Sequence, residues 1–149
     1  MAGLIYTRDA DLVNQTPVGA DNPLPVTAAV YPVGATPLTS ASGNVTNNQA
    51  QASLAAVSGK TNYICGLTVS GGGSTAGLGV SVTVAGTIGG SIFFPVVAPA
   101  GAVVPMPGLQ LTFSPPIPAS AANVAIVATL PALGAGNLYA GIVIHGFRI

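Results

Sequence analysis

Apolar and polar residues alternate along two stretches of the chain, residues 78–84 and 109–113. In both stretches every second residue is apolar, and the residues between are small or polar. The apolar positions are Leu78, Val80, Val82, Val84, Leu109, Leu111 and Phe113. A period of two places side chains on one face of a strand. We therefore expect two half-buried strands whose apolar side chains face a core.

Four further apolar segments have the length of strands: residues 62–69, 91–97, 123–130 and 138–147. Pro95 interrupts the second of them. Because proline donates no hydrogen bond to a strand ladder, we expect an edge strand or a bulge there. Residues 51–57 are rich in alanine and fit either a strand or a short helix.

Clusters of glycine and proline separate these segments, and they recur roughly every 10–15 residues as turn signals. They lie at residues 71–73, 89–90, 99–101, 115–118 and 134–137. No amphipathic helical stretch lies between the segments, so the pattern predicts an all-β fold. We expect an antiparallel sandwich of about seven or eight strands, with a jelly roll as the first choice and an immunoglobulin-like sandwich as the second.

The first 48 residues follow a different pattern, because they hold five of the 13 prolines and show little apolar periodicity. Proline fixes its own φ and drives the residue before it to an extended conformation. We therefore predict an extended, proline-rich N-terminal arm at residues 1–48 and a jelly-roll-like body at residues 49–149.

Composition then limits the function. Only 4% of the 149 residues are charged and the formal net charge is zero, whereas 50% are hydrophobic. Binding to nucleic acid requires clustered lysine and arginine, so we expect no nucleic acid as partner. Glycine and proline break every apolar stretch and the N-terminus lacks a signal pattern, so we expect no membrane span and no secretion. A surface with so few charges predicts a protein that is bound to copies of itself or to a larger assembly.

Groups that perform catalysis or bind metals are scarce. The chain has one histidine, His145, one cysteine, Cys65, and three acidic residues, all before residue 22. His145 lacks an acidic partner close in sequence, so we expect it to make a local hydrogen bond beside Val143 and Phe147. Cys65 has no basic neighbour and is expected to be a buried, inert side chain. We predict no catalytic residue, no cofactor and no metal site.

Two glycine-containing motifs match nucleotide-binding loops only in part. Gly59, Lys60 and Thr61 match the end of a phosphate-binding loop, but Leu54 stands where its first glycine is required. Residues 71–77 are rich in glycine without the dinucleotide-binding spacing. We interpret the first motif as a turn between strands and the second as a flexible loop.

The charged residues cluster in the arm at Arg8, Asp9 and Asp11. Together with Pro23 and Pro25, these residues are the candidates for contact with a partner. The alternative is a solvated terminus that binds nothing.

Several segments resemble a family of short proteins encoded near the head genes of tailed phages and prophages. These segments are residues 37–45 (PLTSASGNV), 59–64 (GKTNYI), 117–123 (IPASAAN), 133–137 (LGAGN) and 145–147 (HGF). The resemblance covers residues 24–149. Proteins of this type are similar in size and composition to jelly-roll capsid cement, or decoration, proteins. The resemblance therefore implies a structural virion protein and no catalytic residues.

On this resemblance we expect a capsid cement protein on the outside of a phage head, made in the host bacterial cytoplasm. Its partners would be a major capsid protein and other copies of itself, in a dimer or trimer. Two alternatives stay open: a tail, neck or fibre component of the virion, and a cellular β-sandwich module that binds carbohydrate or peptide. We expect no enzymatic activity.

Overall fold

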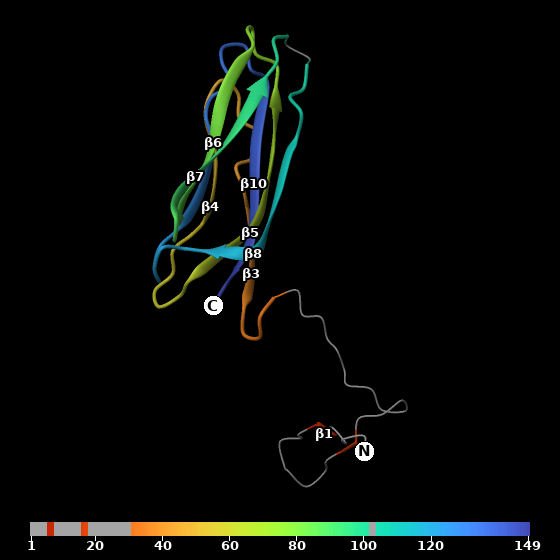
Figure 1. Cartoon of the computed structure of the whole chain (residues 1–149). Coiled ribbons are helices and arrows are strands. Elements are labelled where there is room, and N and C mark those ends of the chain that lie inside the picture. The colour runs from red at the N-terminus through yellow and green to blue at the C-terminus, as the bar shows by residue number, and fades with distance from the viewer. Residues whose placement is uncertain (1–5, 8–15, 18–30, 102–103) are drawn as a thin grey trace. The chain divides into compact units, whose positions relative to one another are not determined.

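The computed structural model describes residues 6–7, 16–17, 31–101 and 104–149. The chain divides into two compact units, Met1–Val30 and Tyr31–Ile149. In the first unit, β1 (Tyr6–Thr7) pairs antiparallel with β2 (Thr16–Pro17). The second unit is the body of the protein and contains strands β3 to β10 (Figure 1). Within the described ranges no helix is long and apolar enough to cross a membrane.

The body consists of two antiparallel sheets of four strands each. The first, which we call the β10 sheet, has the order β3-β10-β5-β8. Its strands are β3 (Thr36–Ala41), β5 (Asn62–Gly72), β8 (Leu109–Pro118) and β10 (Tyr139–Arg148). The second, the β9 sheet, has the order β4-β9-β6-β7. Its strands are β4 (Ala50–Leu54), β6 (Leu78–Thr87), β7 (Gly90–Ala98) and β9 (Ile126–Leu130).

The pairing order is that of a jelly roll. β3, the first strand of the body, pairs with β10, the last. Moving inward along the chain, β4 pairs with β9, β5 with β8, and β6 with β7. Such pairing is one long hairpin wound into two layers. It confirms the predicted antiparallel sandwich, and it differs from an immunoglobulin sandwich, in which the first two strands are neighbours in one sheet.

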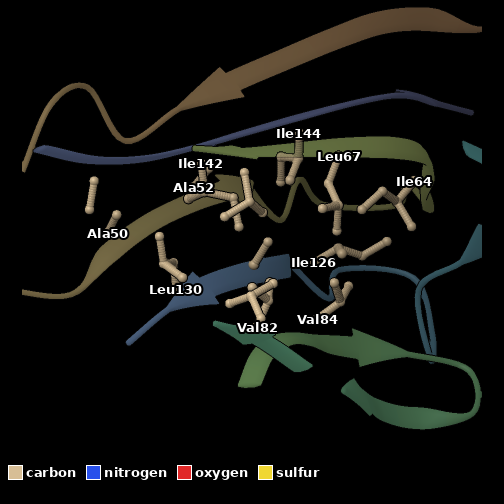
Figure 2. Close-up of a cluster of buried hydrophobic side chains, with 14 of the residues drawn as sticks. Ala50, Ala52, Ile64, Leu67, Val82, Val84, Ile126, Leu130, Ile142 and Ile144 are labelled. Carbon is tan, nitrogen blue, oxygen red and sulfur yellow. The ribbon is translucent and has the colours of Figure 1, made fainter. Parts of the chain in front are cut away.

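The core lies between the two sheets, whose side chains point toward one another (Figure 2). Fully buried side chains include Ile64, Leu67, Val82, Val84, Ile126, Leu130, Ile142 and Ile144. Both sheets contribute, and buried residues alternate with more exposed ones along β9. Burial of each such side chain is worth about 1.5–3 kcal/mol relative to its exposure. This cluster therefore holds the two sheets together.

The predicted core is confirmed in part. Val82 and Val84 are fully buried. Four more of the predicted side chains are half-buried and pack against the core: Val80, Leu109, Leu111 and Phe113. The prediction for Leu78 is wrong, because its side chain is 39% exposed. Leu78 is the first residue of β6, and fewer neighbours cover a side chain at a strand end.

All the predicted strands are present. The ambiguous alanine-rich segment forms the strand β4 and no helix. β7 is an edge strand of the β9 sheet, which confirms the prediction made from Pro95.

The predicted boundary between arm and body at residue 48 is wrong. β3 lies inside the predicted arm, yet it pairs with β10 from Ala41 opposite Val143 to Thr36 opposite Arg148. An edge strand needs ladder hydrogen bonds on one side only, so it tolerates Pro37 and hides its strand character. The body begins at Tyr31. Apart from β1 and β2, the predicted extended arm at residues 1–30 lies outside the described residues.

Three aromatic rings fasten the start of the body to its last strand. The rings of Tyr63 and Phe147 stack with centroids 4.8 Å apart, and the Tyr31 ring lies 5.6 Å from Phe147. A register shift between His145 and Gly146 precedes Phe147 on β10. Phe147 is buried but lies outside the core cluster, so these rings cover the outer face of the β10 sheet.

The glycine-rich residues 71–77, predicted to be a flexible loop, are in part tightly packed. Gly72 has a φ of +152°, and a β-carbon there would lie 2.5 Å from the carbonyl oxygen of Val104. Ser74 is fully buried, and its hydroxyl donates to the carbonyl of Ala76 at 2.6 Å. The fully buried Asn137 side chain donates to the carbonyl of Gly72. Glycine serves close packing of loops here, which low-complexity sequence conceals.

Candidate binding surface

The body contains few charged, nucleophilic or metal-binding side chains. The three acidic residues precede residue 22, so its charged side chains are Lys60 and Arg148. The Lys60 side chain is exposed, and the backbone N–H of Lys60 donates to the Val57 carbonyl at 3.1 Å. With Gly59 at a φ of +70°, this geometry confirms the predicted turn. In the part of the chain that the structure describes, no group of three or more His, Cys, Asp or Glu side chains lies close enough to hold a metal ion.

The buried polar residue Asn62 ties β5 to neighbouring segments of the fold. The Asn62 side-chain amide donates to the carbonyls of Leu54, Ala55 and Val124, at 3.0, 3.0 and 3.1 Å. Asn62 also lies opposite Arg148 in the ladder between β5 and β10. The Arg148 side chain is half-buried, and its Nε is buried. The Arg148 guanidinium is therefore only partly accessible to a binding partner.

Among residues 31–101 and 104–149 no acidic side chain lies beside His145 or Cys65, since residues 22–149 contain none. His145 is half-buried on the outer face of the β10 sheet. It packs over Gly66, where a β-carbon would lie 2.7 Å from its Cε1. Cys65 is a free thiol and is half-buried, whereas full burial was expected. Desolvation raises the pKa of Cys65, which keeps the thiol protonated and slow to react.

The predicted partner-binding residues Arg8, Asp9, Asp11, Pro23 and Pro25 lie outside the described residues. Their part in binding stays a prediction.

β7 carries apolar side chains on both of its faces. Those that face the core are Ile92, Phe94, Val96 and Ala98. Phe93 and Val97, on the opposite face, are 62% and 64% exposed, and Pro95 between them is also exposed. Residues at i, i+2 and i+4 of a strand line one face. Phe93, Pro95 and Val97 therefore form a continuous apolar stripe on the outside of the β9 sheet, which we call the β7 stripe.

The neighbours of the β7 stripe are small and uncharged. Across the ladder to β6, its three residues lie opposite Thr83, Ser81 and Gly79, respectively. A β-carbon at Gly79 would meet no atom within 4 Å, so the surface beside Val97 is open. Small neighbours leave the stripe uncovered, and none of them adds a charge to it.

The stripe continues into a hollow between β7 and β8. The hollow has a volume of about 290 Å³ and is lined by Pro95, Val96, Val97, Pro107, Gly108 and Leu109. β7 and β8 are each the last strand of their sheet, so the hollow lies where both sheets end. We call the β7 stripe and this hollow together the β7–β8 surface. Contiguous apolar surface of this kind marks a binding site more often than scattered apolar side chains do.

A second hollow of about 270 Å³ lies over β10, where Asn44, Ser70 and Tyr139 are among its lining residues. These side chains are of the kind that bind sugars. However, Tyr139 is half-buried, and its hydroxyl lies 3.1 Å from the position of a β-carbon on Gly72. The ring is not a free stacking platform, which makes the β7–β8 surface the stronger candidate.

Comparisons of the chain with protein-family models, curated proteins and solved structures find no match. The class of the protein therefore follows from its own geometry: in the described residues it is a β-sandwich in jelly-roll order with an uncharged apolar edge at β7 and β8.

Pro95 predicts an edge strand at residues 91–97, but the outward side chains of this strand were not among the predicted binding residues. The signal is present, because the six consecutive residues 92–97 are all apolar. A strand that is apolar on both faces must expose one of them when only one face meets a second sheet.

Proposed function

We propose that this protein is a structural component of a tailed-phage virion, a capsid cement protein that binds the outside of the head and stabilises it. The observation that carries the proposal is the β7–β8 surface, an uncovered apolar edge on a jelly-roll body without acidic residues. Exposed apolar patches rimmed by polar residues are typical of protein–protein contacts. The resemblance to proteins encoded near phage head genes supplies the class of partner.

The proposed mechanism is stabilisation by binding. A ligand that binds the assembled lattice and not its separated subunits stabilises the lattice by mass action. The gain is about 2.7 kcal/mol per site when free ligand is at 100 times its Kd. Many copies bind to one head, so their gains add up, and a small protein can stabilise the whole head.

Attachment through the body is expected to be insensitive to salt. Residues 61–147 contain no charged side chain, so apolar contact, backbone hydrogen bonds and shape carry the binding. Salt screens charges, with a Debye length of roughly 3 Å at 1 M, and it leaves apolar contacts in place.

The test compares virions with and without the protein. Heads that lack it should release their DNA at a lower temperature, and addition of the purified full chain should restore the wild-type temperature. The protein should also stay on the particle from low salt to about 1 M. Two results would overturn the cement role: equal heat stability of both particles, or location of the protein on the tail in electron micrographs. Release by moderate salt would overturn the uncharged mode of attachment.

A further inference from the structure

We propose that one water molecule binds in a buried site between Asn62 Oδ1 and Arg148 Nε and hydrogen-bonds to both atoms. The site lies at the end of the sandwich where β5 begins and β10 ends. It shares no residue with the β7–β8 surface, so the inference goes beyond the proposed function and does not depend on it. The bound water would fasten the end of the last strand to the interior of the body.

The backbone brings these two side chains together. Thr61 and Ile149 exchange both of their backbone hydrogen bonds, with N···O distances of 2.9 and 3.1 Å. In an antiparallel ladder the next pair of residues is then not hydrogen-bonded, and its Cα atoms approach to about 4.5 Å. That pair is Asn62 and Arg148, which lie opposite each other. Because directly opposed residues project from the same face of a sheet, their side chains are neighbours.

Asn62 Oδ1 and Arg148 Nε are both buried, and neither has a hydrogen-bond partner among the described residues. The Asn62 side chain is only 1% exposed. Its other terminal atom is surrounded by the carbonyls of Leu54, Ala55 and Val124, so that atom is the amide nitrogen and Oδ1 is the acceptor. The site therefore holds one acceptor without a donor and one donor without an acceptor. Native proteins rarely leave such buried groups unpaired.

The chemistry of the two atoms selects the ligand. The ligand must donate to Oδ1 and accept from the Nε–H, whereas an anion only accepts and an ammonium-type cation only donates. It must also be small, because both atoms are buried. Water meets both conditions. Buried water makes about three hydrogen bonds, and the carbonyls of Leu54, Ala55 and Val124 each have a second lone pair that could accept the third.

The water would extend a polar network that already crosses this end of the body. Through its amide, Asn62 joins β5 to the last residue of β4, Leu54, and to Val124, which precedes β9. Through the water, β10 joins the same network at Arg148. Phe147, the preceding residue, packs against the rings of Tyr31 and Tyr63. Loss of the water should therefore loosen the end of β10 before any other part of its sheet.

The direct test is a high-resolution crystal structure of the full chain. We expect a water oxygen about 2.7–3.2 Å from both Asn62 Oδ1 and Arg148 Nε. In solution, the Arg148 Nε–H proton should exchange slowly and show a nuclear Overhauser effect to a bound water. Three results would overturn the proposal: a direct hydrogen bond between Nε and Oδ1, an Arg148 Nε that faces bulk solvent, or an Nε–H that exchanges as fast as in the unfolded chain.

A pair of variants tests the energetics. Arg148→Met keeps the aliphatic part of the side chain and removes the Nε–H donor. If water satisfies that donor, the variant loses a hydrogen bond, and its Tm should fall by about 2–4 °C. If the Nε–H is instead unpaired, its removal relieves a cost, and the Tm should rise.

Lys60→Met is the matched control. It removes the other cation of the body, beside Thr61 at the same end of the sandwich, but from an exposed side chain. Its Tm should change by less than about 2 °C. An unchanged or raised Tm of Arg148→Met, or an equal fall in both variants, would overturn the inference, since charge alone would then account for the effect or there would be none.

Discussion

The two sides of the sandwich, where the sheets end, are built differently. On the side of β3 and β4, a hydrogen bond joins the sheets: the Ser53 N–H donates to Ser40 Oγ at 3.1 Å. Leu54 on this side is only 2% exposed. On the side of β7 and β8, two apolar rings meet instead, with the centroids of Phe94 and Phe113 6.2 Å apart. Leu109, Leu111 and Phe113 on β8 stay half-buried there.

The two sides therefore differ in how completely their groups are buried or hydrogen-bonded within the chain. The polar groups that join β3 to β4 are already satisfied within the chain, so a partner adds little there. The apolar groups of the β7–β8 surface are still in contact with water, and their burial is favourable by roughly 25 cal/mol per Å². A partner therefore gains most where the fold itself has left apolar area uncovered.

The largest expected effect sets the two sides against each other directly. Leu54→Ala should lower the free energy of unfolding by about 3 kcal/mol, because it leaves a cavity in a closed site. Leu111→Ala should cost about half as much, roughly 1.5 kcal/mol, because part of the side chain is already in water. Urea unfolding at low protein concentration measures both. Equal losses would show that the β7–β8 side is as closed as the other.

A smaller effect concerns the hydrogen bond that closes the β3–β4 side. Ser40→Ala removes the acceptor of the Ser53 N–H and should destabilise the protein by about 1 kcal/mol. Ser81→Ala, an exposed serine beside the β7 stripe, is the control and should change stability by less than about 0.5 kcal/mol. Thermal unfolding of the two variants tests this contrast, which a loss as large at Ser81 would contradict.

Pro95→Thr should change folding stability little and association much. Pro95 leaves the outer edge of β7 without a donor at its centre. The substitution supplies this donor, so we expect copies of the chain to associate strand to strand. Light scattering and thioflavin fluorescence would detect it. Pro37→Thr on β3 is the matched control and should stay free of such association, because polar side chains flank that edge. If both variants assemble strand to strand, or if neither does, the proposed difference between the β7 and β3 edges is wrong.

The smallest effect concerns Cys65, in the central strand β5 beside β8. Burial raises its pKa above 9.0, so less thiolate is present at a given pH. Alkylation by iodoacetamide at pH 8–9 should be slower in the folded chain than in urea, and Leu111→Ala should speed it more than Leu54→Ala does. The unfolded thiol ionises first, so the contribution of Cys65 to stability is present below pH 9.0 and is lost as pH rises through the folded pKa. Equal alkylation rates in the folded and unfolded chain would contradict this picture.

Prediction from sequence succeeded where the signal is local. Alternation placed Val82 and Val84 in the core, and Pro95 marked an edge strand. It failed where the answer depends on what lies opposite. Leu78 alternates correctly but lacks cover, and the glycines at residues 71–77 pack against loops distant in sequence. The strand β3 was missed for the same reason, because its ladder partner among the described residues is the last strand.

The sequence by itself determined that the chain is all-β, that its strands lie between clusters of glycine and proline, and that residues 61–147 carry no charge. These properties belong to single residues and their near neighbours. Only the tertiary structure decided that the first strand of the body pairs with the last, and that one apolar face of β7 is covered while the other is open. The physical reason is separation along the chain: the Ile142 N–H donates to Ser42 Oγ across 100 residues. Periodicity identifies the side chains that share a face, but not which face meets a second sheet.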